Sequence, residues 1–130
     1  MDPVARFLQG PQNSCQIDAG AATAVVGDPL IATAGLGLVA TDGARVIGVA
    51  GEDFAVSGTK YKMDLLVPGS IWLFQKASGT TIVVDAAVAM AASLLVDGGT
   101  AADYAIGYRV PHAQEDSTHV AVRIEHHILV

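Results

Sequence analysis

Few side chains in this sequence could do covalent or metal chemistry: the single cysteine, Cys15, and four histidines, His112, His119, His126 and His127. A thiol nucleophile needs a neighbouring base, so Cys15 could in principle work with His112 or His119. However, no catalytic signature surrounds Cys15, and its place beside an expected strand favours a buried or half-buried packing role. The adjacent pair His126-His127 would point to opposite faces of a strand, and no histidine has the partner spacing of a zinc site. We therefore expect no catalytic and no metal-binding residues.

Three acidic segments invite comparison with ion-binding loops: Asp42-Gly43, Glu52-Asp53 and Asp97-Gly98. None has the alternating ligands and closing glutamate of an EF-hand loop, and turn formation explains them more simply. Gly35-Leu36-Gly37 lacks the following helix signal that a dinucleotide-binding fingerprint requires. The sequence therefore predicts no cofactor, and it carries no enzyme signature.

The most aromatic segment, Ile71-Trp72-Leu73-Phe74, leaves one binding function open. An exposed Trp72 could stack on a sugar ring beside the acidic loops, as in a small carbohydrate-binding β module. Packing of Trp72 and Phe74 in the core is the preferred interpretation, because large aromatic side chains dominate protein interiors. The carbohydrate-binding module remains the alternative function.

The composition narrows the class of partner. Hydrophobic residues make up 52% of the 130 residues but charged residues only 15%, against about 25% in ordinary soluble domains. So much apolar and so little charged surface indicates that part of it is covered by other subunits. The net charge of −6, with the seven basic residues scattered, argues against nucleic acid as a partner.

The sequence also predicts where the chain is made. The longest apolar stretch, Ala86 to Val96, is interrupted by Ser93 and is far shorter than the roughly 18 residues of a membrane helix. We expect no membrane association. No basic segment leads from Met1 into an apolar one, so we expect no secretory signal and synthesis in a cytoplasm.

Two apolar runs with a central glycine organise the expected fold: Val46–Ala50 and Ala105–Val110. A glycine inside a strand marks a bulge, a barrel corner or a close approach of two backbones. The two runs are 59 residues apart, and each follows a Gly-rich spacer. We pair Gly27–Ile31 with Ser93–Val96 as the segments that precede these spacers. The pattern predicts a mainly β fold, a small barrel or sandwich with two pseudo-repeated halves.

Other elements follow from local patterns. Leu38–Ala40 and Val46–Ala50 flank Asp42-Gly43 and are expected to form a hairpin. The alanine-rich segment 85–96 fits both a helix that begins at Asp85 and a strand with alternating apolar residues; composition favours a short helix over about 85–95.

The first 14 residues are expected to form an irregular N-terminal arm, followed by one β-rich domain over 15–130. Pro3, Gly10 and Pro11 would interrupt any long element here. Val4, Phe7 and Leu8 are apolar residues in this arm and are the candidate contacts with neighbouring subunits or with a larger assembly.

Taken together, these segments resemble the capsid decoration, or cement, proteins of tailed bacteriophages. The resemblance lies in Gly-Asp-Pro-Leu-Ile…Asp-Gly…Val-Ile-Gly-Val-Ala over residues 27–50, in Ala-Ile-Gly-Tyr-Arg-Val at 105–110 and in Val-Ala-Val-Arg-Ile at 120–124. The alanine-rich segment 86–92 and the tail 126–130 depart from the pattern.

The resemblance implies a β-rich protein that forms a homotrimer on the outer surface of a virion. Its partner would be the major capsid protein, and its role would be to hold adjacent capsomers together against the pressure of the packaged DNA. It would bind near three-fold or quasi-three-fold positions of the expanded shell, after synthesis in the host cytoplasm.

Overall fold

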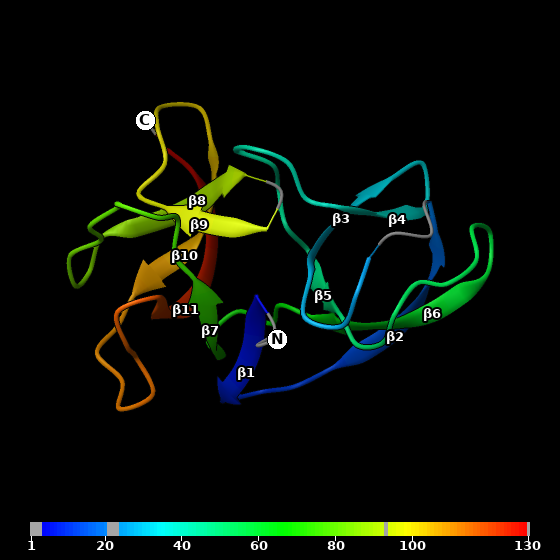
Figure 1. Cartoon of the computed structure of the whole chain (residues 1–130), viewed down its shortest axis with the longest axis horizontal. Coiled ribbons are helices and arrows are strands. Elements are labelled where there is room, and N and C mark those ends of the chain that lie inside the picture. Colours follow the sequence, from blue (N-terminus) through cyan, green and yellow to red (C-terminus); the bar gives the residue numbers. More distant parts are fainter. Residues whose placement is uncertain (1–3, 21–23, 93, 130) are drawn as a thin grey trace.

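The structure, a computed structural model, describes residues 4–20, 24–92 and 94–129, and over these residues it is built from strands and loops (Figure 1). The predicted mainly β fold is confirmed. No helix among the described residues is long and apolar enough to cross a membrane. The strands of this part of the chain are β1 (Ala5–Gln9), β2 (Ser14–Ala19), β3 (Pro29–Thr33), β4 (Leu36–Val39), β5 (Gly48–Ala50), β6 (Lys60–Leu65), β7 (Ile71–Gln75), β8 (Ala87–Ala92), β9 (Leu95–Asp97), β10 (Tyr104–Arg109) and β11 (His119–Ile128).

The strands form two bodies that lie side by side along the long axis of the molecule (Figure 1). Strands β2 to β6 close into a small barrel in the order β2-β4-β3-β5-β6. The remaining strands form a six-stranded sheet in the order β1-β7-β11-β10-β8-β9. We refer to β2–β6 as the first unit and to β7–β11 as the second unit.

The two units have the same strand order. In the first unit β3 pairs with β4 and β5, and β5 pairs with β6. In the second unit β8 pairs with β9 and β10, and β10 pairs with β11. In both units all of these pairs are antiparallel. The predicted pseudo-repeated halves therefore correspond to two copies of one topology.

The register agrees residue by residue. Gly48 lies opposite Leu65, and Gly107 lies opposite Ile124, so both strands of the second pair are displaced by 59 residues. The short parallel contact between β2 and β4, at Ala19 and Gly37, also recurs, as a bridge between Lys76 and Val96. Such agreement in both antiparallel and parallel pairs identifies an internal duplication.

The duplication corrects one alignment made from the sequence. Gly27 and Asp85 occupy equivalent places, because their amides donate to Ala50 and Arg109 in the two units. The counterpart of 27–31 is therefore 85–89, and not the segment at Ser93–Val96. Ser93 itself lies outside the described residues.

Both strand glycines are sites of close backbone approach, as expected. A Cβ at Gly48 would lie 2.7 Å from the Asp64 carbonyl oxygen, and one at Gly107 would overlap the Arg123 carbonyl oxygen. Gly107 also follows an irregularity in the pairing of β10 with β11.

The predicted hairpin is wrong. Leu36–Val39 pairs with β3 through a two-residue turn at Ala34-Gly35, and β3 separates it from β5. Both turn residues have positive φ, 51° and 79°, which is the signature of the tight turns whose twist suits a hairpin. The Asp42-Gly43 turn instead belongs to a longer connection that crosses over β3.

The helix expected over about 85–95 is also wrong, because residues 87–92 form β8. Val88, Ala89 and Met90 are fully buried, and β8 is hydrogen-bonded to β9 on one side and β10 on the other. The helix preference of alanine amounts to a few tenths of a kcal/mol per residue, which such pairing and burial outweigh. Asp85 is not a helix cap but has a left-handed φ of 70°.

The irregular arm is only partly found. Residues 5–9 form β1, which pairs antiparallel with β7 and continues the sheet of the second unit. Ala5 is buried in the core. Gly10 to Asn13 then lead to β2, which begins at Ser14. Residues 1–3 of the predicted arm lie outside the described residues.

The core consists of two clusters of buried hydrophobic side chains. The larger one lies mainly in the second unit and receives Ala40, Val46 and Val49 from the first. The smaller one fills the barrel, around Leu30, Phe54 and Met63. The shared cluster joins the units into one body, so that the surface loops of both are held by a common scaffold.

Candidate functional site

An apolar groove of about 600 Å³ lies where β1 meets the turn before β3. Two of the three predicted contact residues, Val4 and Phe7, are among its lining side chains. The edge of the Phe7 ring packs on Trp72, with ring centroids 5.6 Å apart. The third predicted residue, Leu8, is the extra residue where the pairing of β1 with β7 shifts, and it is half-buried. Other apolar side chains of the lining are Val25, Val26, Val49 and Leu94.

Two carboxylates hold the turn at the rim of this groove. Asp28 is 4% exposed and accepts a hydrogen bond from the Val25 amide at 2.9 Å. Asp53 accepts one from the Val26 amide, also at 2.9 Å. Burial raises the pKa of Asp28, the hydrogen bond from Val25 opposes this, and the charge of Asp53 raises it further. With both amides held inward, the valine side chains project from the turn.

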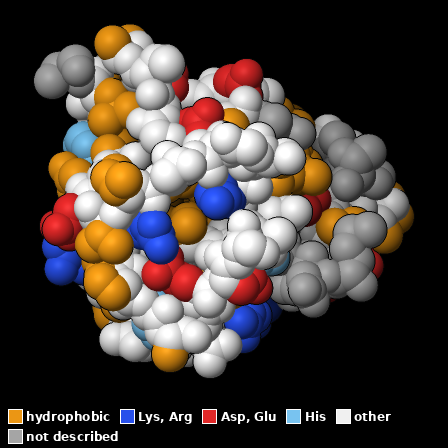
Figure 2. Space-filling view, turned by 60° about the vertical axis from the view of Figure 1, so that its left-hand side comes forward, with side chains coloured by type: hydrophobic (Ala, Val, Ile, Leu, Met, Phe, Trp, Pro, Cys, Tyr) orange, Lys and Arg blue, Asp and Glu red, His pale blue; other side chains and the backbone are white. Residues whose placement is uncertain are grey.

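The surface carries large hydrophobic side chains that the fold leaves in solvent. Figure 2 shows hydrophobic side chains grouped on the face turned to the viewer, with charged groups spaced between them. Among the described residues, the exposed large hydrophobic side chains are Val25, Val26, Leu36, Val56, Val83, Val84, Tyr104 and Ile128.

Trp72 does not offer a stacking surface. It is 4% exposed, and its indole nitrogen donates to the buried Ser70 hydroxyl at 3.1 Å. So little exposed area leaves no open ring face for a sugar, and Phe7 packs against the ring. The core role preferred for Trp72 is therefore the one found.

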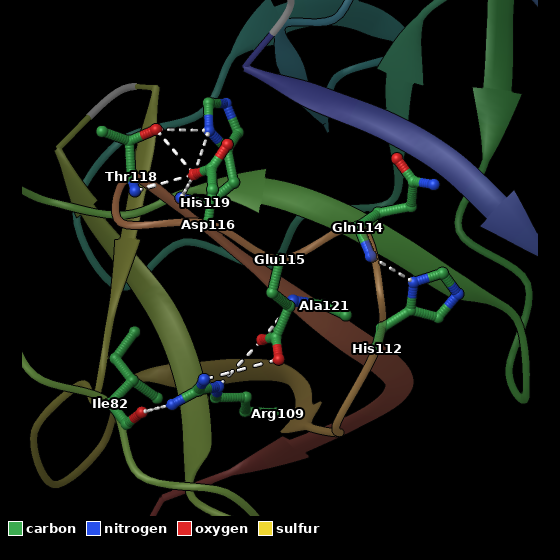
Figure 3. A network of polar contacts seen from close by, with 9 residues as sticks. All are labelled: Ile82, Arg109, His112, Gln114, Glu115, Asp116, Thr118, His119 and Ala121. Atoms are coloured by element: carbon green, nitrogen blue, oxygen red, sulfur yellow. Dashed lines mark hydrogen bonds and ion pairs between the residues drawn. The ribbon is translucent and has the colours of Figure 1, made fainter.

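A dense polar network lies in the loop between β10 and β11 (Figure 3). Arg109 and Glu115 form an ion pair at 2.9 Å, and Arg109 also donates to the carbonyl oxygen of Ile82. Glu115 accepts a further bond from the Ala121 amide at 2.9 Å. Burial alone would raise the pKa of Glu115, but the hydrogen bonds from Arg109 and Ala121 and the Arg109 charge lower it overall. The network fastens the loop to the sheet.

Next to it, Asp116, Thr118 and His119 resemble a catalytic triad in composition but not in geometry (Figure 3). The Thr118 hydroxyl and the Asp116 carboxylate both contact Nδ1 of His119, at 2.7 and 3.4 Å. A proton relay needs the nucleophile and the carboxylate on opposite ring nitrogens. Asp116 instead accepts from the backbone amides of Thr118 and His119, and these hydrogen bonds, the Thr118 amide first, lower its pKa to about 2. The arrangement is that of a capped turn.

Cys15 is exposed, which corrects the expected packing role. It lies on β2 opposite Met63, and Met63 is the residue of this pair that fills the barrel. Its suggested partners lie elsewhere: His112 contacts the Gln9 side chain at 3.3 Å, and His119 belongs to the capped turn. The described residues contain no group of three or more metal-ligating side chains.

The remaining histidines are on β11, on opposite faces as expected. His127 stacks on Tyr108, with ring centroids 4.9 Å apart. His126 is half-buried, and its Nδ1 atom is buried without a hydrogen-bond partner among the described residues. Burial lowers the pKa of His126, a backbone hydrogen bond with Leu66 opposes this, and the charges of Arg45 and His127 lower it further.

Sequence reasoning missed the two turns that carry Val25-Val26 and Val83-Val84. A signal was present, since Thr-Ala-Val-Val at 23–26 is repeated as Thr-Ile-Val-Val at 81–84. The two segments are 58 residues apart and not 59, so an alignment fixed on the strand glycines does not superimpose them.

No family model, curated protein or solved structure matches this chain.

Proposed function

We propose that this chain is a structural protein of a tailed-phage virion that binds the outer surface of the head. It stabilises contacts between capsomers of the major capsid protein and acts as a homotrimer. The short motifs over 27–50, 105–110 and 120–124 support the phage assignment, and the low charge content supports a role in an assembly.

The observation that carries the proposal is the apolar groove with its exposed valine rim. Val25 and Val26 stand in solvent at the edge of a groove lined by Val4 and Phe7. Exposed apolar groups around a hollow are typical of protein interaction sites. Burying each valine would contribute roughly 1–1.5 kcal/mol, so a few such side chains give a weak contact, which repetition over a symmetric shell makes stable.

The test is binding to expanded, DNA-free heads assembled from the major capsid protein of the same genome. The wild-type chain should sediment with the heads and raise the temperature at which they fall apart. Val26→Asp should lower the apparent affinity at least tenfold, because a carboxylate would be buried in an apolar contact. Val56→Asp, at an exposed site outside the groove, is the matched control and should bind normally.

Two results would contradict the proposal. One is wild-type protein that stays in the supernatant at every head concentration. The other is binding that leaves the heat stability of the heads unchanged, because a structural role requires that the bound state holds the capsomers together.

A further inference from the structure

The exposed valine pairs occupy the same turn in the two units. The Asp28 amide donates to the Val25 carbonyl at 3.0 Å, and the Ala86 amide donates to the Val83 carbonyl at 3.1 Å. The third residue of each turn has positive φ: Gly27 at 94° and Asp85 at 70°. These are the features of a type II turn. We refer to the two turns as the first and second valine turns.

The fold does not account for valines at these places. The second position of a type II turn favours proline, and turns in general favour polar residues. Yet Val25 and Val26 are 50% and 54% exposed, and Val83 and Val84 are 65% and 43% exposed. An apolar pair in solvent contributes nothing to the core, so its presence points to a contact with another molecule.

Other exposed apolar positions differ between the units. Val56 is exposed, and the residue at the equivalent distance from the β5–β6 and β10–β11 pairs is Glu115, which forms the ion pair with Arg109. Leu36 is exposed, whereas Leu95 at the start of β9 is half-buried. Among the described residues, the valine turns are the large apolar side chains exposed at equivalent places in both units.

From this pairing we propose that the two valine turns bind two identical apolar sites, one on each of two neighbouring copies of the same shell subunit. This inference rests on the proposed function and names its geometry. A chain that carries one contact element twice matches a partner that presents one site twice, and adjacent copies of a single subunit do so. One chain then bridges two subunits through its own two units, before any contribution from trimer formation.

Bivalent attachment predicts a particular pattern of binding. Loss of either turn converts the chain to a single attachment and should weaken binding by a similar factor, in the range of 10²–10⁴ for a rigid pair of sites. It should also change the saturation ratio. The wild-type chain occupies two sites, so heads should saturate with half as many wild-type chains as single-turn variants.

The experiment compares V25S/V26S, V83S/V84S and the four-fold variant on the same expanded heads. Binding isotherms and the number of chains per head at saturation are measured by sedimentation and mass photometry. Val56→Ser is the control. Because the substitutions lie on exposed turns, far-ultraviolet circular dichroism and native mass spectrometry should show an unchanged fold and oligomer. The four-fold variant should not bind.

The outcomes separate this inference from the proposed function. If wild-type protein binds heads but V83S/V84S has unchanged affinity and saturation, the single groove suffices and the bridging inference is wrong. If either variant loses its oligomeric state, the valines join copies of this chain and the inference is likewise wrong. If wild-type protein does not bind heads at all, the proposed function fails and this inference fails with it.

Discussion

Replacing Gly107 by alanine tests the close packing of β10 against β11. A Cβ at this position would overlap the Arg123 carbonyl oxygen and lie 2.8 Å from the Arg123 carbonyl carbon and 2.9 Å from the Glu125 amide nitrogen. All of these atoms are backbone, so no side chain can turn aside. The two strands must separate at the centre of the second unit.

The expected cost follows from this geometry. Overpacking in a core typically costs 1–3 kcal/mol, and a clash with backbone on both sides should reach the upper end, about 3 kcal/mol. An entropy of unfolding of about 2.1 cal/mol/K per residue gives about 0.27 kcal/mol/K for a chain of this length, so the Tm should fall by about 11 °C. Gly48→Ala should cost less, because Met63, one of its two close neighbours, is a flexible side chain.

Differential scanning calorimetry of the variants measures this order. Gly98→Ala is the matched control, since a Cβ there would meet no atom within 4 Å; it should leave stability unchanged or raise it slightly, because alanine restricts the unfolded chain. A Gly107→Ala protein with a Tm within about 2 °C of wild type, or one more stable than Gly48→Ala, would refute the reasoning.

Two further predictions concern titrating groups. Glu115→Gln removes the charge that Arg109 pairs with, and should destabilise by about 1–2 kcal/mol at pH 7; because the pKa of Glu115 is lowered in the fold, the deficit should vanish as the pH falls below 4.5, which urea unfolding at several pH values would show. The pKa of His126 is lowered as well, so the unfolded chain takes up this proton first, and wild-type stability should fall as the pH drops below 6.5. His126→Asn should flatten that part of the pH profile, and an identical slope in both proteins would contradict the assignment.

Strands with a single solvated face could be predicted from the sequence. The alternation that begins at Lys60 marks β6, and the run at Val120–Ile124 marks the centre of β11. The two glycine strands were also predictable, with their role in close backbone contact. In each case the local pattern and the final environment agree, so no distant contact is needed to decide the structure.

Elements whose state depends on distant partners could not be predicted in this way. The alanines of β8 favour a helix locally, and only burial between β9 and β10 makes this segment a strand. The pairing of β4 with β3 depends on a two-residue turn in which a non-glycine residue, Ala34, has positive φ, which composition does not reveal. The valine turns required knowledge of the duplication, because an exposed valine pair has no meaning in one unit alone.

The N-terminal strand shows how the two copies have diverged. Cys15 and Trp72 are equivalent, since each lies opposite the matching residue of β6 or β11, Met63 or Val122. In the first unit this position is a small, exposed thiol. In the second it is a large ring that water would solvate poorly, and Phe7 of β1 packs on it. β1 is therefore a cover that the second unit requires because its β7 carries tryptophan. The same strand presents Val4 to the groove, so the residue change that made β1 necessary to the fold also built one wall of the candidate binding surface.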